Sequence, residues 1–360
     1  MKSDFLLYGS TGFVGSVIAR RAVASGLRPL LASRSGEKVK VQAEELDLEY
    51  MVFGLEDRQA LDEAVDRVGL VLHCAGPYIH TFEPMVEACL RQRAHYLDIT
   101  GEIPVLEQLV DRDTQAKEKG VMIMPAVGFD VVATDCLTVH LKQRLPSATQ
   151  LTLAIHGDGP AGMPPGTART SIEMLPYGIR VRRDGRLVPA PQDGGRKVDF
   201  GNGPRRVTRI TWGDLVTAYH STGIRNIETY IALPRQLASL LSAVRKVKSV
   251  FKVPVVRRLA RLILPAGSTP QERAMTKSHV WVKVKDGAGR SAVSRLHGPE
   301  GGVEWTSRAA LAAVDRALAG EVELGFQTPG SVYGPDFVFD VEGVRREDLP
   351  LSGPAPDASI

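Results

Sequence analysis

The sequence has few cysteines, and their positions argue against two classes of protein. Only three occur among 360 residues, Cys74, Cys89 and Cys136. They form no C-x-x-C pair and no cysteine and histidine pattern with metal-ligand spacing, so we predict neither a disulfide framework nor a metal site. Reduced thiols in a cytoplasmic protein are the simplest account of them.

Long apolar runs are also missing. No uninterrupted apolar stretch approaches the about 20 residues that a membrane span requires. The first predicted strand begins within a few residues of Met1, which leaves no room for a signal peptide. The 45 Lys and Arg residues nearly balance 41 Asp and Glu residues, and a net charge of +4 is too small to indicate nucleic-acid binding.

What the sequence does contain is clearest at its start, where a strand, a glycine turn and a helix follow one another. The apolar run 4–8 leads into the turn 9–15, and a helical pattern continues to residue 25. Glycines allow a sharp turn and a close approach of the backbone to a diphosphate, whose charge would face the N–H groups of the new helix. This order is typical of the first unit of a dinucleotide-binding fold.

The end of the second strand indicates which dinucleotide binds. Residues 30–32 are followed by Ser33 and Arg34, where NAD-preferring proteins usually carry an Asp or Glu for the ribose hydroxyls. A guanidinium can pair bidentately with a 2′-phosphate, so the pattern favours NADP(H) over NAD(H). The alternative is that Arg34 is a solvated loop cation and that Glu37 binds the ribose.

Strands and helices alternate through the first third of the chain. Further strands are predicted at 48–53, 70–74, 95–98 and 121–124, with helices between them. Six such strands indicate an α/β fold with a Rossmann-type doubly wound parallel sheet, whose ligands bind at the carboxyl ends of the strands. We place this NADP-binding domain at residues 1–130 and expect residues 303–345 to rejoin it through a late, alanine-rich helix.

The pattern changes in the second part of the chain. Hairpins are predicted around Asp184-Gly185 and Asp286-Gly287, and residues 149–156 alternate between apolar and polar. We therefore predict an inserted α+β domain at residues 131–302, with a mainly antiparallel sheet, that serves the substrate and dimerisation. A homodimer is expected, and residues 346–360 are predicted to be a tail.

One segment, 235–264, is basic and amphipathic and contains no Asp or Glu. Such a segment fits a pair of helices on an anionic membrane, or a lid over a lipid-like substrate. The more ordinary interpretation, which we favour, is a pair of helices that covers a core or a dimer interface and keeps its cations in water.

Four segments in this order and spacing resemble the saccharopine dehydrogenase-like oxidoreductases, and among them the trans-acting enoyl reductases. They are residues 9–15, 74–78, 95–102 and 128–136. The resemblance implies a Rossmann domain, an inserted α+β domain and a cleft between them. No cationic clamp for an amino-dicarboxylate substrate is identifiable, which argues against a role in lysine metabolism.

The resemblance also implies a set of cofactor-binding residues. Those that match the diphosphate turn are Gly9, Ser10, Thr11, Gly12, Phe13 and Val14. Those at the position that selects NADP are Ser33 and Arg34. Those in the turn beneath the nicotinamide ribose are Cys74, Ala75, Gly76 and Pro77.

Hydride transfer requires mainly orientation from the protein, together with a proton donor. Tyr78 follows the turn after the fourth strand, so its hydroxyl is a candidate donor, and the alternative is a packed aromatic lid. His220 is a candidate acid from the second domain, unless it is structural. Asp130, at the crossing between the domains, is the third candidate, or else it caps the helix that follows.

Asp98, Thr100 and Glu102 form a polar cluster after the fifth strand. They are candidates for chemistry, and helix capping is the alternative. Cys136 has no evident base beside it, so we do not expect a thiolate nucleophile.

These residues and the resemblance together predict an NADP(H)-dependent oxidoreductase. Its substrate would be small and apolar or amphipathic, and the bond reduced would be C=C (enoyl) or C=N (imine). The alternative is a non-catalytic NADP(H)-binding sensor or scaffold protein, peripheral to a membrane through residues 235–264.

Overall fold

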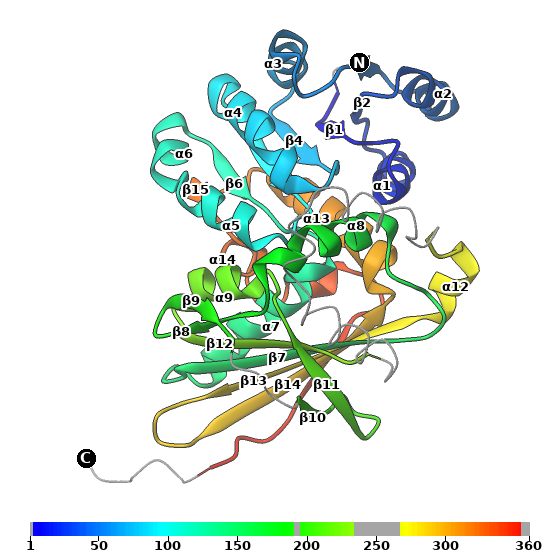
Figure 1. Ribbon diagram of the computed structural model, residues 1–360. Helices are drawn as coiled ribbons and strands as arrows, with labels where there is room; N and C mark the ends of the chain where they lie inside the picture. Colours follow the sequence, from blue (N-terminus) through cyan, green and yellow to red (C-terminus); the bar gives the residue numbers. More distant parts are fainter. Residues whose placement is uncertain (1–2, 191–194, 234–266, 354–360) are drawn as a thin grey trace.

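The computed structural model describes residues 3–190, 195–233 and 267–353 (Figure 1). The amphipathic segment 235–264 lies outside these residues, so the structure does not address its predicted helices or membrane contact. In the described part, no helix combines the length and the apolar character that crossing a membrane would require.

A parallel sheet of seven strands forms the upper part of the molecule in Figure 1. Its order is β15-β6-β5-β4-β1-β2-β3, so the chain moves outward from β1 to β3 and then returns to β4 on the other side. The predicted doubly wound fold is confirmed, and β1 and β4 meet where the strand order reverses. The strands are β1 Leu6–Tyr8, β2 Leu30–Ser33, β3 Tyr50–Val52, β4 Leu70–His73, β5 His95–Asp98, β6 Met122–Met124 and β15 Gly325–Phe326.

Helices cover both faces of this sheet because its strands are apolar on both sides. Leu7 and its neighbours on one face pack against α1 and α13, whereas Leu6 and its neighbours on the other face pack against α3 and α4. The helices of this part are α1 Phe13–Ala24, α2 Gly36–Leu46, α3 Arg58–Asp66, α4 Phe82–Gln92, α5 Ile103–Val110, α6 Asp113–Lys119 and α13 Thr306–Leu318.

A second sheet forms the lower part of the molecule (Figure 1). Its order is β10-β11-β12-β7-β13-β14-β16, and the hairpin of β8 and β9 joins it at β12. Only β12 and β7 pair in parallel among its described strands, so the prediction of a mainly antiparallel sheet is confirmed. The strands are β7 Gln150–Asp158, β8 Arg180–Arg183, β9 Arg186–Pro189, β10 Arg196–Asp199, β11 Pro204–Ile210, β12 Asn226–Ile231, β13 Lys277–Lys285, β14 Ser291–Pro299 and β16 Arg345–Asp348.

Helices connect the two sheets. α7, Phe129–Arg144, and α9, Asp214–Thr222, pack together and cover the apolar face of the second sheet. α8, Pro165–Met174, lies between the two sheets in Figure 1. After the second sheet, the chain returns to the first: α13 packs against α1, and β15 pairs with β6.

The structure differs from the prediction of a tail that begins at residue 346. Arg345–Asp348 forms β16, which pairs with β14, and the backbone of Ser352 exchanges two hydrogen bonds with Ser291. β16 is an edge strand without apolar residues, so its sequence carries no hydropathy signal. Side chains hold it instead: Arg295 forms an ion pair with Glu347 at 3.1 Å, and Asp348 is bound by His140, Arg144 and Ser294.

Candidate dinucleotide and active site

In the turn after β1, the backbone at Gly12 and at Gly15 comes close to the carbonyl of Gly9. Gly9 has a φ of +84°, and its amide donates to the carbonyl of Ala32 at 2.8 Å. A Cβ on Gly15 would overlap the carbonyl oxygen of Gly9, and a Cβ on Gly12 would lie 3.1 Å from the same atom. Glycine is therefore required at the start and end of the turn, and larger side chains would crowd its middle.

This turn leaves the beginning of α1 open. Gly12 occupies the N-cap position of α1 and supplies no side-chain cap, and it is itself exposed. The first N–H groups of a helix have no partner inside the helix, and they attract anions. The Ser10 hydroxyl, next in the turn, is buried and has no hydrogen-bond partner within the described residues.

The two predicted cofactor turns lie in contact. A Cβ on Gly9 would lie 2.9 Å from the Ala75 nitrogen and 2.9 Å from the Cys74 carbonyl carbon. The segment from Cys74 to Pro77 follows β4, and its Gly76 is exposed. The structure thus places these turns side by side at the carboxyl edge of the sheet.

Ser33 and Arg34, after β2, differ in their exposure. The buried Ser33 hydroxyl lies 2.9 Å from the Thr11 hydroxyl and accepts from the amide of Ser35 at 3.2 Å, which fixes the end of β2 beside the glycine turn. Arg34 is exposed and forms no ion pair with any residue in the described ranges. Its guanidinium is available to an anionic ligand at this edge.

Glu102 holds the turn after β4 in place. Its carboxylate is buried and accepts hydrogen bonds from the backbone amides of Tyr78 at 2.7 Å and Ile79 at 2.8 Å. It also accepts from the hydroxyl of Thr170 on α8, at 3.2 Å. Burial raises the pKa of Glu102, although these hydrogen bonds oppose the shift. Glu102 occupies the N-cap position of α5, as the capping alternative expected, but its side chain ties the β4 turn to α8.

Asp98 makes the corresponding connection between the loops after β5 and β6. It accepts from the Tyr96 hydroxyl at 2.7 Å and from the amides of Thr100 and Ala126, each at 2.9 Å. Burial raises its pKa to about 6. Thr100 in turn accepts from the amide of Glu102 at 3.2 Å, so the polar cluster predicted after β5 connects three neighbouring loops.

Asp130 lies in a break at the beginning of α7. Its backbone is non-helical, with φ −82° and ψ 79°, and the N-cap of the helix is Gly128. The carboxyl lies against Gly101, where a Cβ would overlap Oδ2, and Oδ1 has no hydrogen-bond partner within the described residues. Burial and the nearby Asp214 raise the pKa of Asp130 well above its ordinary value.

The other two predicted donors lie elsewhere. The Tyr78 hydroxyl donates to the carbonyl of His73 at 3.3 Å, and the buried Tyr78 ring packs edge-on against His73. This geometry favours the packed aromatic alternative. His220 is exposed, and its ring meets Phe326 of β15 at 4.8 Å. Strands β6, β5 and β4 separate β15 from β1, so the structure does not bring His220 to the glycine turn.

The sequence analysis missed three residues of this region. Asp214, at the start of α9, is fully buried, and burial raises its pKa to about 7. Thr170 binds Glu102, and Arg273 of α12 (Pro270–Met275) lies over the ring of Phe13. Each lies far along the chain from the residue that it faces, so no local sequence signal could have revealed it. No group of three or more His, Cys, Asp or Glu residues in the described ranges is arranged to hold a metal ion.

Comparison with known proteins identifies the first sheet. Residues 5–124 match the family model of the saccharopine dehydrogenase NADP binding domain. This part of the chain is thus similar to an NADP-binding domain. The predicted cofactor, NADP(H), is therefore confirmed at the level of the domain family, and the glycine turn, Arg34 and the β4 turn all lie inside the matched NADP-binding domain.

Curated relatives are oxidoreductases by name. The chain is 26% identical to the human saccharopine dehydrogenase-like oxidoreductase over 218 residues, which cover 52% of this chain and 50% of the relative. It is 33% identical to the trans-acting enoyl reductase of Mycobacterium leprae (strain TN) over 150 residues, which cover 39% of this chain and 36% of the relative. The chain thus matches about half or less of the length of these relatives.

A solved structure supports the fold as a whole. The apo saccharopine dehydrogenase (L-Glu forming) of Saccharomyces cerevisiae aligns with a TM-score of 0.65 over 97% of this chain and 100% of that chain. Its sequence identity is 13%, so the likeness concerns the arrangement of the two sheets and their connections.

The exposed guanidinium of Arg34 generates the first prediction. Arg34→Ala should weaken NADPH binding at least tenfold, because a charged contact to a phosphate is worth about 1.5–3 kcal/mol, and should change NADH binding by less than about threefold. Parallel fluorescence titrations with the two nucleotides measure both. Equal weakening of NADPH and NADH would instead make Arg34 a solvated loop cation.

The hydrogen bonds from the turn after β4 to Glu102 generate the second prediction. Glu102→Gln removes one of the two oxygens that accept from Tyr78 and Ile79, so the free energy of unfolding should fall by about 1–3 kcal/mol. Denaturant unfolding measures it. Glu107→Gln, at an exposed position on the same helix α5, is the matched control and should change stability by less than about 0.5 kcal/mol. Similar effects of the two substitutions would argue against the tether.

The buried carboxyl of Asp214 generates the third prediction. Its pKa is about 7 in the folded protein and 3.8 as an ordinary Asp, so the folded state binds this proton more tightly and loses stability as the pH rises from 4 to 7. Asp214→Asn should therefore stabilise the protein at pH 8, by at most about 4 kcal/mol, and should gain much less at pH 4. Unfolding curves at both pH values test it, and an identical gain at both would contradict it.

Proposed function

We propose that the protein is an NADP(H)-dependent reductase that acts on a C=C or C=N bond of a small, apolar or amphipathic substrate. The observation that carries this proposal is the contact between the turn after β1 and the turn after β4, with Arg34 exposed beside them, in a domain of an NADP-binding family. Oxidoreductase names among the relatives support the reaction class.

The residues present suit the cofactor. The uncapped start of α1 and the amides of residues 9–12 would hold the diphosphate, and the buried Ser10 hydroxyl still lacks a partner there within the described residues. Ser33 and Arg34 would hold the 2′-phosphate. The segment 74–77 would support the nicotinamide ribose. When bound, NADPH supplies the hydride.

Asp130 is the proton donor in this proposal. Reduction of the substrate adds a hydride to one atom of the double bond and a proton to the other, so a group that stays protonated near neutral pH must lie at the site. We assign this role to Asp130, because burial and Asp214 raise its pKa well above the ordinary value and its Oδ1 has no hydrogen-bond partner among the described residues. After the transfer, Asp130 recovers its proton from solvent.

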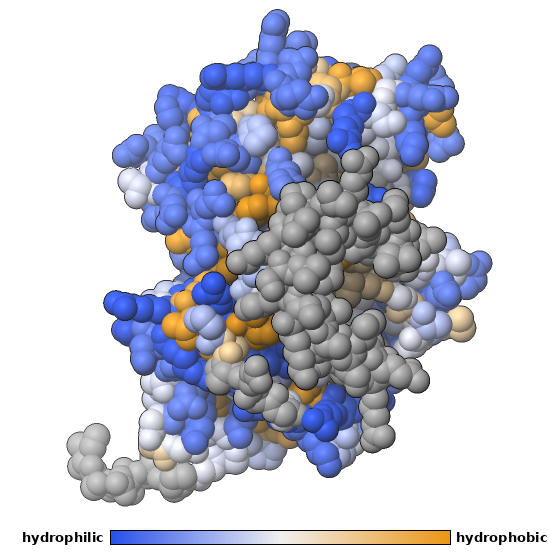
Figure 2. Space-filling view, viewed as in Figure 1, coloured by the Kyte–Doolittle hydropathy of each residue, from blue (hydrophilic) through white to orange (hydrophobic). Residues whose placement is uncertain are grey.

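The surroundings favour a substrate with apolar parts. Figure 2 shows apolar side chains gathered on the surface between the upper and lower parts of the molecule. Met163 and Tyr177, on either side of α8, expose 43% and 47% of their surface. One relative is named a trans-acting enoyl reductase, in agreement with a C=C acceptor. The predicted homodimer and the predicted membrane contact through residues 235–264 stay predictions.

Binding and turnover of NADPH test the function. The purified protein should blue-shift or quench NADPH fluorescence and should oxidise NADPH with at least one member of a panel of enoyl thioesters and cyclic imines. Binding without oxidation across the panel would favour the non-catalytic sensor. Absence of any response to NADPH would remove the proposal.

The role of Asp130 generates a fourth prediction. Asp130→Asn should lower turnover at least about 100-fold, the usual contribution of a general acid, and leave the Kd for NADPH within about twofold. Turnover of the unchanged protein should decline as the pH rises and Asp130 loses its proton, and the variant should lack this decline. Steady-state kinetics against pH measure both.

Tyr78→Phe serves as the comparison. The Tyr78 hydroxyl donates to the backbone carbonyl of His73, so we expect its removal to leave turnover within about threefold. A large loss with Tyr78→Phe together with a small one for Asp130→Asn would reverse the assignment.

A further inference from the structure

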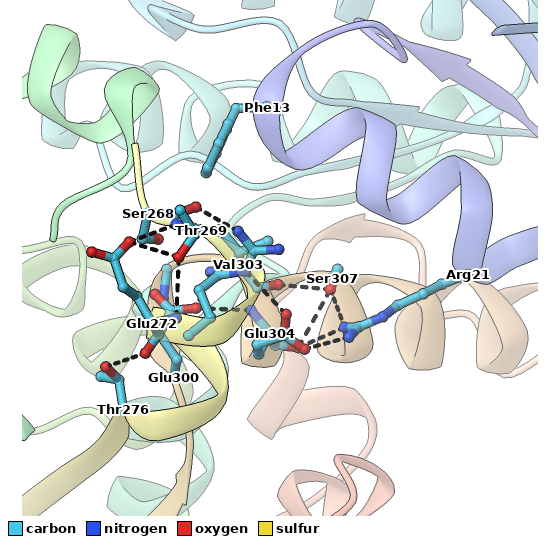
Figure 3. Close-up of polar contacts among 12 residues, drawn as sticks. Phe13, Arg21, Ser268, Thr269, Glu272, Thr276, Glu300, Val303, Glu304 and Ser307 are labelled. Atoms are coloured by element: carbon cyan, nitrogen blue, oxygen red, sulfur yellow. Dashed lines mark hydrogen bonds and ion pairs between the residues drawn. The ribbon is translucent and has the colours of Figure 1, made fainter. Parts of the chain in front are cut away.

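Phe13, the first residue of α1, is contacted by residues from the second half of the chain. A Cβ on Gly267 would lie 2.8 Å from the ring atoms Cε2 and Cζ of Phe13 and 3.3 Å from Pro165. The guanidinium carbon of Arg273 lies 5.8 Å from the centre of the Phe13 ring. Figure 3 shows Phe13 pointing from the start of α1 toward the segment that carries Ser268 and Thr269.

Arg273 is buried and held in one orientation. Its side chain is 9% exposed; Nε donates to Glu304 Oε1 at 3.1 Å, and Nη1 donates to the carbonyl of Ser268 at 2.7 Å. Its third nitrogen, Nη2, has no hydrogen-bond partner within the described residues. This nitrogen is a donor that remains available to a further acceptor.

Glu304 does not neutralise this charge, because it is shared. It also pairs with Arg21 of α1, which donates to Ser307 as well (Figure 3). Burial alone would raise the pKa of Glu304, but hydrogen bonds from Arg21 and Arg273 lower it. One carboxylate therefore faces two guanidinium groups, so Glu304 does not pair with Arg273 alone.

The position of this charge matters because the turn itself has none. From Gly9 to Ala19 the sequence contains no charged residue. A diphosphate carries two negative charges, and the neutral amides of the turn can only partly balance them. The exposed Arg34 is already assigned to the 2′-phosphate at the end of β2.

We propose that Arg273 completes the dinucleotide site from outside the NADP-binding domain. Glu304 positions its guanidinium over Phe13, so that the cation acts on the diphosphate at the start of α1 and holds Phe13 against the turn. This proposal rests on the cofactor part of the proposed function. It also explains why α12 carries a capping box, in which Thr269 and Glu272 bond each other's backbone: the short helix must present Arg273 at a fixed place.

Binding measurements with two nucleotides distinguish a contact of Arg273 with the diphosphate from a purely structural role. NADPH contains the diphosphate, whereas adenosine 2′-monophosphate contains only the phosphate assigned to Arg34. Arg273→Gln should weaken NADPH binding roughly tenfold or more, and the loss should shrink at high salt. It should leave the affinity for adenosine 2′-monophosphate within about twofold. Arg273→Lys, which keeps the charge, should recover part of the NADPH affinity.

The control is Arg295→Gln. Arg295 is as buried as Arg273, at 8% exposure, and forms ion pairs with Asp199 and Glu347 on the second sheet, remote from Phe13. Arg295→Gln should leave the affinities for NADPH and for adenosine 2′-monophosphate unchanged, even if it lowers thermal stability.

The outcomes separate the two proposals. If the unchanged protein binds neither nucleotide, the proposed function fails. If it binds NADPH and Arg273→Gln binds NADPH equally well, the role of Arg273 is wrong while the proposed function stands. Equal weakening of NADPH and adenosine 2′-monophosphate by Arg273→Gln would also overturn the proposal, because it would show a general disturbance of the turn.

Discussion

The nucleotide-binding edge depends on the close approach of backbones at Gly9. The β1 turn folds back until the Gly9 carbonyl fills the space of a side chain at Gly15, and Gly9 itself touches the backbone of Cys74 and Ala75. Any side chain at Gly9 or at Gly15 would overlap these backbone atoms. Because the β1 and β4 turns meet there, the position of one fixes the position of the other, and the start of α1 stays open to an anion.

Buried carboxylates extend this fixed edge toward the second sheet. Glu102 links the β4 turn to α8, and Asp98 links the loops after β5 and β6. Both accept backbone amides, which is how a buried carboxylate is stabilised without a cation. Asp130 and Asp214 lie beyond them, and there burial raises the pKa. This region thus contains carboxylates that hold loops together and carboxyl groups whose pKa is raised by burial.

The sequence predicted the features that depend on local pattern. Apolar runs located the strands of the first sheet, and Asp-Gly pairs located two hairpins of the second. It did not predict β16, whose residues are all charged, or the meeting of His220 with Phe326, which depends on a two-residue strand from the end of the chain. The orientation of Tyr78 could not be predicted from the sequence for a related reason. The position after a strand is visible in the sequence, but the direction of its hydroxyl is set by the buried His73.

Arg273 illustrates the general limit. Its neighbours are Phe13, Ser268 and Glu304, and only one of them is near it in the sequence. Pairings of this kind come from the return of the chain from the second sheet to the first, and no periodicity records them. They nevertheless join the second half of the chain to the start of α1.

A crystal structure of the protein with NADP⁺ bound tests the central claim most directly. The account predicts the diphosphate against the backbone amides of residues 9–12 at the start of α1, and the 2′-phosphate within hydrogen-bonding distance of the Arg34 guanidinium. A nucleotide bound away from this turn, or one whose 2′-phosphate points into solvent with Arg34 turned aside, would contradict it.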